Sequence, residues 1–300
     1  MGDFILTLPA VSALRRRWPG AYIELAGYEK STRLALVTGL VDRLQSLDSA
    51  RMALYFQGEC ALPPEEKEYI RSFDLIVSYL YDPEGVLLKH LKDAGAENII
   101  AVSPVEIKLH AAGHFFSALK GVLGDASCLP AKLEWPEPLK QAARRRLAAE
   151  VGKKRVIIIH PGSGSPAKNW PAEKFAALAK KIWNETDFAP VIIGGEADDK
   201  AMAVLRPLLP EFNFIVNVPL ADIASILSVA DGYVGNDSGI THLAAALGIQ
   251  VVALFGPTDP AIWAPRGKNV LVIKSRLPSN ESLAEIGIED VFLALKKKAL

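Results

Sequence analysis

The sequence contains little cysteine. Cys60 and Cys128 are the only two in 300 residues, they lie far apart, and neither has a cluster of His or Cys beside it. This spacing argues against a disulfide framework and against a structural zinc site. We therefore expect a reduced, cytoplasmic protein.

Net charge and uninterrupted apolar runs are absent as well. Lys and Arg number 34, as do Asp and Glu, so the chain lacks the positive field that nucleic-acid binding needs, and we expect no nucleic-acid partner. The apolar start has no basic region and is broken by Pro9, which argues against a signal peptide. Residues 238–258 carry no Asp, Glu, Lys or Arg, but Gly248 and Pro257 interrupt them. They predict a helix, a Gly stop and a buried strand rather than a transmembrane segment.

What the sequence does contain is alternation. Short apolar runs alternate with helix-length amphipathic segments, as in parallel sheets with crossover helices, and the length predicts two domains. The first half predicts strands near 22–26, 43–47, 75–79 and 99–102, with helices that include 8–18 and 110–123. The second half predicts strands over 156–160, 190–194, 213–218, 232–235, 251–255 and 270–274, with helices over 139–150, 172–184, 198–209, 221–230 and 240–247. We expect an α/β fold of two doubly wound, parallel-sheet (Rossmann-like) domains facing a cleft, with the boundary after residue 138.

The loop HPGSGSPAKNWP follows the first strand of the second half. Gly162 and Gly164 let backbone N–H groups approach an anion, Ser163 and Ser165 add hydroxyl donors, and Lys168 adds a positive charge. The loop is neither a Walker A motif nor a full dinucleotide fingerprint. It predicts a phosphate cradle, and the alternative is a tight turn that caps a helix.

The segment NDSGITH also joins a strand to a helix. The backbone amides of Ser238 and Gly239 fall at the positive end of the helix dipole, with Asp237 and His242 beside them. The alternative role for Asp237 is that of an N-cap carboxylate. A third loop ends in Glu196, whose carboxylate can accept hydrogen bonds from a ribose diol. The three loops together predict a nucleotide diphosphate site.

Four segments resemble glycosyltransferases of the ADP-heptose:lipopolysaccharide heptosyltransferase family: GDFILTLPA at the start, HPGSGSPAKNWP, the GGE loop over 194–196, and GNDSGITHLAAALGIQVVALFGPTDP. The resemblance covers essentially the whole chain. It implies a GT-B fold with an acceptor-binding domain over 1–138 and a nucleotide-sugar-binding domain over 139–280. Residues 281–300 would form a helical segment that packs back on the N-terminal domain.

The resemblance implies an inverting, metal-independent transferase that needs no cofactor. It would move a heptose from ADP-heptose, its ADP-sugar donor, to a lipopolysaccharide core acceptor at the inner face of the inner membrane, with the enzyme cytoplasmic or peripheral there. The absence of an Asp-x-Asp pair agrees with metal independence. Three alternatives stay open: another nucleotide sugar, an isomerase of the nucleotide-sugar 2-epimerase kind, and a non-catalytic nucleotide-sugar binding protein.

The resemblance also assigns residues. Asp3 matches the general base that deprotonates the acceptor hydroxyl, and Lys168 matches the lysine on the leaving diphosphate. Both roles suit an inverting displacement, which needs a base opposite the leaving group and positive charge on that group. The expected nucleotide-sugar-binding residues are Gly162, Ser163, Ser165, Lys168, Glu196, Asp237, Ser238, Gly239 and His242.

Two further expectations concern the N-terminal half. Family members carry an apolar strand directly before the Gly-Asp motif, whereas here only Met1 precedes it. Either the sequence is truncated at its start, or the sheet lacks its central first strand. In the second case we expect unpaired neighbouring strands and Asp3 on a frayed terminus. A phosphorylated acceptor favours cations, and the candidates are Arg15, Lys108, His110 and His114, which can equally be exposed charges on helix starts and faces.

Overall fold

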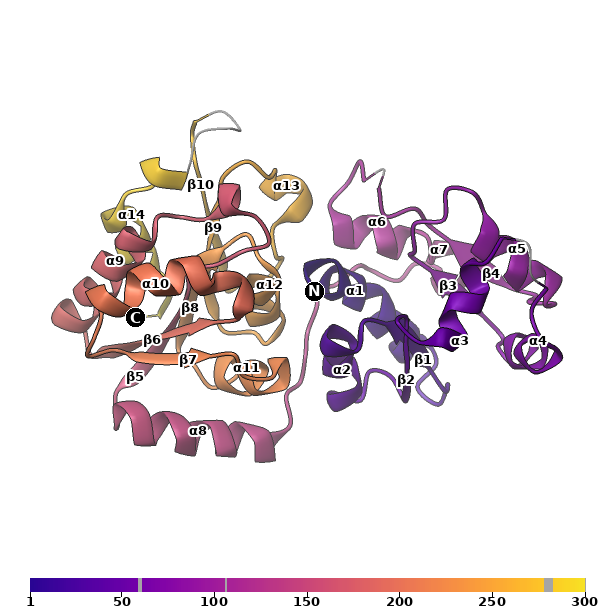
Figure 1. The fold of residues 1–300 in the computed structure, drawn as a ribbon, viewed down its shortest axis with the longest axis horizontal. Helices are drawn as coiled ribbons and strands as arrows, with labels where there is room; N and C mark the ends of the chain where they lie inside the picture. The colour runs from indigo at the N-terminus through magenta and orange to yellow at the C-terminus, as the bar shows by residue number, and fades with distance from the viewer. Residues whose placement is uncertain (59–60, 106, 278–282, 300) are drawn as a thin grey trace. The chain divides into compact units, whose positions relative to one another are not determined.

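The computed structural model describes residues 1–58, 61–105, 107–277 and 283–299 (Figure 1). The chain divides into two compact units, one formed by Pro9–Leu129 and the other by Met1–Leu8 with Pro130–Leu300. We call them the N-terminal unit and the C-terminal unit. The division falls before the expected boundary at 138, because the connecting segment already packs in the C-terminal unit. There Leu133 N donates to Ala246 O at 2.8 Å, and the buried Trp135 donates through Nε1 to Ser225 Oγ at 2.9 Å.

A six-stranded parallel sheet in the order β10-β9-β8-β5-β6-β7 forms the centre of the C-terminal unit. All six predicted strands are confirmed: β5 Arg155–His160, β6 Phe188–Gly194, β7 Asn213–Val216, β8 Gly232–Asn236, β9 Gln250–Phe255 and β10 Val270–Lys274. The β5 residues 156–160 are all buried, as expected for a strand covered on both faces. The chain runs outward from β5 to β7 and then from β8 to β10 in the other direction. The order therefore reverses between β5 and β8, which is where ligands bind in such sheets.

Helices lie on the two faces of this sheet (Figure 1). On one face, the apolar side chains of α9, α10 and α14 share a core with Ile157, Ile159 and Ile192. Elsewhere α12 contacts β8 and β9, and α11 contacts α8 and α12. The bounds are α8 Glu137–Val151, α9 Ala172–Glu185, α10 Asp199–Leu208, α11 Leu220–Leu227, α12 Gly239–Ala246, α13 Pro260–Trp263 and α14 Ile288–Ala299, with short 3₁₀ helices η2 Pro166–Lys168, η3 Glu196–Asp198 and η4 Leu283–Glu285.

The uncharged stretch 238–258 folds as α12 followed by β9, as expected. Among the described residues, no helix combines the length and the apolar character that crossing a bilayer demands. Of the two cysteines, Cys60 lies outside the described residues, and the Cys128 thiol donates to Ala112 O at 3.6 Å.

The expected packing of residues 281–300 on the N-terminal domain stays a prediction, and the described part of this segment contributes to the core of the C-terminal unit. Helix α14 packs against α9 and β9 of the C-terminal unit. Its side chains Val291, Phe292 and Leu295 are buried in the core on that face of the sheet. The apolar face of α14 thus covers the same face of the sheet as α9 does. Residues 281, 282 and 300 lie outside the described residues.

The described residues of the N-terminal unit hold two separate pairs of parallel strands instead of one doubly wound sheet. Strand β1 Glu24–Gly27 pairs with β2 Arg43–Ser46, and β3 Ile76–Ser78 pairs with β4 Ile99–Ala101. Each predicted strand is present, but the described residues contain no strand that joins the two pairs. The helices are α1 Gly2–Arg17, which begins in the C-terminal unit and enters this unit at Pro9, α2 Glu29–Val37, α3 Ala50–Ala53, α4 Pro64–Arg71, α5 Val86–Asp93, α6 Ala111–Ser117 and α7 Lys120–Leu123, with η1 Leu54–Phe56.

Helix α1 is longer than predicted. It begins at Gly2 and continues through Pro9, which was expected near its start. Asp3 therefore lies in the first turn of a helix, where a carboxylate complements the dipole, and not on a frayed terminus. Pro9 has no N–H, so the carbonyl of Ile5 receives no helical hydrogen bond from it. The predicted helix over 110–123 is divided into α6 and α7.

Candidate functional site

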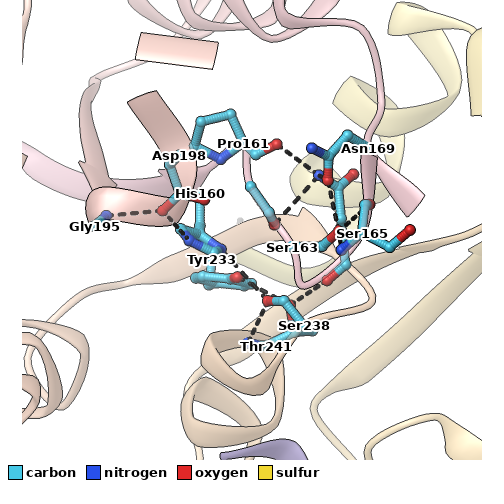
Figure 2. A network of polar contacts seen from close by, with 12 residues as sticks. His160, Pro161, Ser163, Ser165, Asn169, Gly195, Asp198, Tyr233, Ser238 and Thr241 are labelled. Carbon is cyan, nitrogen blue, oxygen red and sulfur yellow. Dashed lines mark hydrogen bonds and ion pairs between the residues drawn. The ribbon is translucent and has the colours of Figure 1, made fainter. Parts of the chain in front are cut away.

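The two loops at the reversal of strand order lie together (Figure 2). They follow β5 and β8, and Asn236, the last residue of β8, connects them. Its side chain is fully buried, donates through Nδ2 to Pro161 O at 2.7 Å, and accepts from Trp170 N at 3.0 Å. One amide thus holds both ends of the loop over 161–170. Asn236 has no role predicted from the sequence, although its position directly before Asp237 in NDSGITH is a signal that could have identified it.

The interior of this loop is held by Ser163. Its hydroxyl lies 2.7 Å from Ser165 O and 2.6 Å from Asn169 Oδ1, and it accepts from Ser165 N at 3.2 Å. These bonds commit the Ser163 hydroxyl to shaping the loop. Gly164 is exposed, and a Cβ there would meet nothing within 4 Å.

Gly162 packs closely against Asp198. A Cβ at this position would lie 1.4 Å from Asp198 Oδ1, so any larger residue would displace the Asp198 carboxylate. Asp198 ends η3, which follows β6 and begins with Glu196. Glu196 itself is exposed. The loop with the expected ribose contact and the loop with the expected phosphate contacts therefore touch through Gly162 and Asp198.

Lys168 and Asp237 form an ion pair with 2.8 Å between Nζ and Oδ2. The same carboxylate oxygen accepts from Thr258 Oγ1 at 2.6 Å. The Lys168 side chain is 30% exposed and that of Asp237 only 8%, so the carboxylate is a buried support and the ammonium is open to a ligand. Thr258 follows β9 and was missed by the sequence analysis, although it stands in the segment GPTDP.

The N-terminus of α12 completes the group. Ser238 is the N-cap residue, since its hydroxyl accepts from Thr241 N at 3.3 Å. The alternative N-cap role of Asp237 is therefore wrong. Gly239 begins the helix, and His242 is buried one turn later.

The start of the chain lies against this helix within the C-terminal unit. A Cβ on Gly2 would be 3.7 Å from both Gly239 Cα and His242 Cδ2. The segment that carries Asp3 is therefore beside the first turn of α12, and Asp3 is exposed there.

A buried chain of hydrogen bonds supports the loops (Figure 2). His160 Nε2 lies 3.2 Å from Asp198 Oδ2, and His160 Nδ1 lies 3.4 Å from Ser238 Oγ. Tyr233 Oη and Thr241 Oγ1 are 2.9 Å apart. Burial raises the pKa of Tyr233, so its phenol stays protonated.

The four cationic candidates belong to the N-terminal unit, where three of them bind their own surroundings. Arg15 pairs with Asp42 at 2.6 Å and donates to Ala21 O at 2.6 Å. His110 caps α6 by accepting from Ala112 N at 3.2 Å, and His114 Nε2 lies 2.8 Å from Ser103 O. Lys108 is exposed. These contacts show structural roles for Arg15, His110 and His114.

The arrangement in the C-terminal unit suits an anion. A helix N-terminus offers backbone N–H groups and a positive partial charge, and Lys168, although paired with Asp237, adds an ammonium donor beside it. Among the described residues, no group of three His, Cys, Asp or Glu side chains lies close enough to hold a metal ion.

Residues 110–290 match the sequence profile of glycosyltransferase family 9 (heptosyltransferase). Lipopolysaccharide heptosyltransferase 2 of Salmonella typhimurium is 31% identical over 166 residues, which cover 52% of this chain and 47% of that protein. The chain thus spans about half the length of this relative, and 43% of the heptosyltransferase 2 of Haemophilus influenzae.

Two solved structures resemble the whole chain. The family 9 glycosyl transferase from Veillonella parvula has a TM-score of 0.80 at 19% identity, covering 99% of this chain and 94% of its own. The Escherichia coli ADP-heptose lps heptosyltransferase II has a TM-score of 0.79 at 19% identity, with 99% and 95% covered. These similarities confirm the expected fold class, an α/β protein of the GT-B type.

Proposed function

Because the chain belongs to glycosyltransferase family 9, the heptosyltransferases, we propose that it transfers a heptose from ADP-heptose to an acceptor of the lipopolysaccharide core. The observation that carries the donor site is the ion pair of Lys168 with Asp237, which holds an ammonium beside the N-terminus of α12. Two independent attractions for a diphosphate therefore act at one place.

The donor would bind along the carboxyl ends of the C-terminal sheet. Its diphosphate would contact Lys168 and the backbone amides of Ser238 and Gly239, and its ribose diol would donate to the exposed carboxylate of Glu196. The remaining expected contacts are those of Gly162, Ser163, Ser165 and Asp237 in the same loops and of His242 in α12. Gly162, Ser163 and Asp237 act mainly by holding the loops in shape, since their contacts are within the protein.

The proposed reaction is an inverting displacement. The acceptor oxygen forms a bond to the anomeric carbon while the bond from that carbon to the diphosphate breaks and ADP leaves. Asp3 takes the proton of the acceptor hydroxyl, and Lys168 with the α12 amides stabilises the charge that develops on ADP. The charge of the leaving group is met by these protein groups, so the proposed reaction uses no metal ion.

Acceptor binding is proposed for the N-terminal half, with Lys108, His110, His114 and Arg15 as the polar contacts. Lys108 is the strongest of these because its side chain is exposed, whereas Arg15 is already bound to Asp42 and Ala21. A lipid-linked acceptor would bring a cytoplasmic enzyme to the inner face of the inner membrane.

The test is consumption of ADP-heptose with and without a deacylated core acceptor, beside a thermal-shift series with ADP-, UDP- and GDP-sugars. A ligand at 100 times its dissociation constant stabilises by about 2.7 kcal/mol, which such a series resolves. The proposal expects stabilisation by ADP-heptose and consumption only with acceptor. Conversion of the sugar without acceptor would instead indicate an isomerase, and binding without turnover under both conditions a binding protein.

A further inference from the structure

His160 connects the two sides of the proposed donor site. It is the last residue of β5 and is 5% exposed, and its two ring nitrogens face different elements (Figure 2). Nε2 faces Asp198 Oδ2 at 3.2 Å, and Nδ1 faces Ser238 Oγ at 3.4 Å. A neutral ring that donates from Nε2 to the carboxylate accepts at Nδ1 from the Ser238 hydroxyl.

Asp198 determines where the Glu196 loop lies. Its Oδ2 accepts from Gly195 N at 2.8 Å as well as from His160. Its carboxylate fills the space beside Gly162, where a Cβ would be 1.4 Å from Oδ1. Burial raises the pKa of Asp198, but the hydrogen bonds from His160 and Gly195 outweigh burial and lower it. Asp198 is therefore a carboxylate at neutral pH, and a buried carboxylate needs its donors.

The two sides of His160 differ in how firmly they are held without it. Ser238 keeps its bond from Thr241 N at 3.3 Å and its contact with Thr241 Oγ1 at 3.1 Å, so the N-cap of α12 remains in place. Asp198 keeps the bond from Gly195 N, which belongs to the loop that Asp198 itself positions. Loss of the imidazole would thus release the Glu196 loop and leave the phosphate-binding helix unchanged.

We infer that His160 is a positioning residue for the nucleoside half of the donor, acting through Asp198 on the Gly195–Glu196 backbone. This inference rests on the proposed donor site. It assigns nucleoside affinity to the pair His160 and Asp198, and diphosphate affinity to Lys168 and α12.

Calorimetric titration of the whole chain with ADP and, separately, with inorganic pyrophosphate tests the inference. His160→Asn keeps an acceptor near Nδ1 but does not reach Asp198, whereas the longer His160→Gln places an amide donor near the Nε2 position. His160→Asn should weaken ADP about tenfold, as expected for one lost hydrogen bond to a charged group, and leave pyrophosphate unchanged. His160→Gln should bind ADP as the wild type does.

Two further variants keep the test decisive. Asp198→Asn examines the pair from its other end and should show the same selective loss of ADP, even where His160→Asn does not fold. His90→Asn is the matched control, because His90 is 6% exposed and binds Tyr55 O at 2.9 Å in the N-terminal unit.

The outcomes separate the two proposals. The positioning role would be overturned if His160→Asn and Asp198→Asn both bound ADP as tightly as the wild type does. It would also be overturned if these two variants lost affinity for ADP and for pyrophosphate to the same extent. If the wild type bound pyrophosphate as tightly as ADP, the nucleoside would add no affinity, and this result would overturn the proposed ADP-sugar donor instead.

Discussion

Lys168 and Asp237 are 69 residues apart in the sequence, and their side chains form an ion pair of 2.8 Å between the loops after β5 and β8. The carboxylate is buried and also accepts from Thr258, whereas the ammonium is partly open to solvent. Asp237 thus fixes the position of the lysine before any ligand arrives. Electrostatic stabilisation of a leaving group is most effective when its charges are already in place.

Replacing Lys168 by Ala should reduce the turnover of heptosyl transfer about 10²–10³-fold, because one preorganised group that stabilises developing charge is lost. Steady-state rates with ADP-heptose and acceptor measure this effect. Lys180→Ala is the control, since Lys180 is exposed on α9 of the same unit. Wild-type rates in a folded Lys168→Ala protein would remove Lys168 from the mechanism.

Gly162→Ala and Gly164→Ala should differ sharply although they lie two residues apart. A Cβ at Gly162 would lie 1.4 Å from Asp198 Oδ1, whereas a Cβ at Gly164 meets nothing within 4 Å. We expect Gly162→Ala to lower the free energy of unfolding by about 1–3 kcal/mol, as overpacking does, and to weaken ADP binding. Gly164→Ala should keep the thermal midpoint of the wild type. Equal midpoints for both variants would contradict the packing of Asp198 against Gly162.

Asp3→Asn should abolish transfer and leave ADP affinity intact, because the base acts on the acceptor hydroxyl and the nucleotide is held by other residues. Single-turnover transfer and ADP titration on the same preparation separate the two effects. Asp125→Asn serves as control, since Asp125 is an exposed carboxylate of the N-terminal unit. Full transfer by Asp3→Asn would require another base, and His110 and His114 would be tested next.

Glu66 on α4 should make the stability of the N-terminal unit depend on pH. It accepts from Arg51 Nε at 2.7 Å and from Tyr55 Oη at 2.5 Å. Burial raises the pKa of Glu66, but these two hydrogen bonds outweigh burial and lower it. A carboxyl whose pKa is lower in the folded state stabilises the fold above its unfolded pKa of about 4.3, and this contribution disappears as the pH falls through the folded pKa.

Glu66→Gln should therefore cost about 1.5–3 kcal/mol at pH 7, the range for hydrogen bonds to a charged group. The difference from the wild type should shrink below pH of about 4. Urea unfolding at both pH values measures it, with Glu65→Gln as control because Glu65 is the exposed neighbour on the same helix. A difference that stays constant with pH would show that the charge of Glu66 is not the cause.

The sequence predicted the strands of the C-terminal unit because each is a short, nearly continuous apolar run with a turn behind it, as in β5 and β9. It also predicted that the loops after β5 and β8 lie together, since glycine and hydroxyl residues cluster where these two strands end. Both signals are local in sequence, and they apply to the C-terminal unit, which contains the whole six-stranded sheet.

Pairings between distant segments were beyond prediction. The contact of Gly162 with Asp198 depends on how two loops meet, and Thr258 was inconspicuous until Asp237 was found beside it. The apolar face of α14 indicated burial but not on which unit. The separation of the pair β1–β2 from the pair β3–β4 likewise depends on which strands form hydrogen bonds with each other, and this pairing cannot be predicted from amino-acid composition.

Hydrogen exchange with and without ADP tests the central claim most directly, because it reports where the nucleotide binds along the whole chain. The account predicts slower exchange over 162–169, 195–198 and 236–243 when ADP is bound, and unchanged exchange over 61–105. Tight ADP binding with unchanged exchange in both the 162–169 and the 236–243 segments would contradict it.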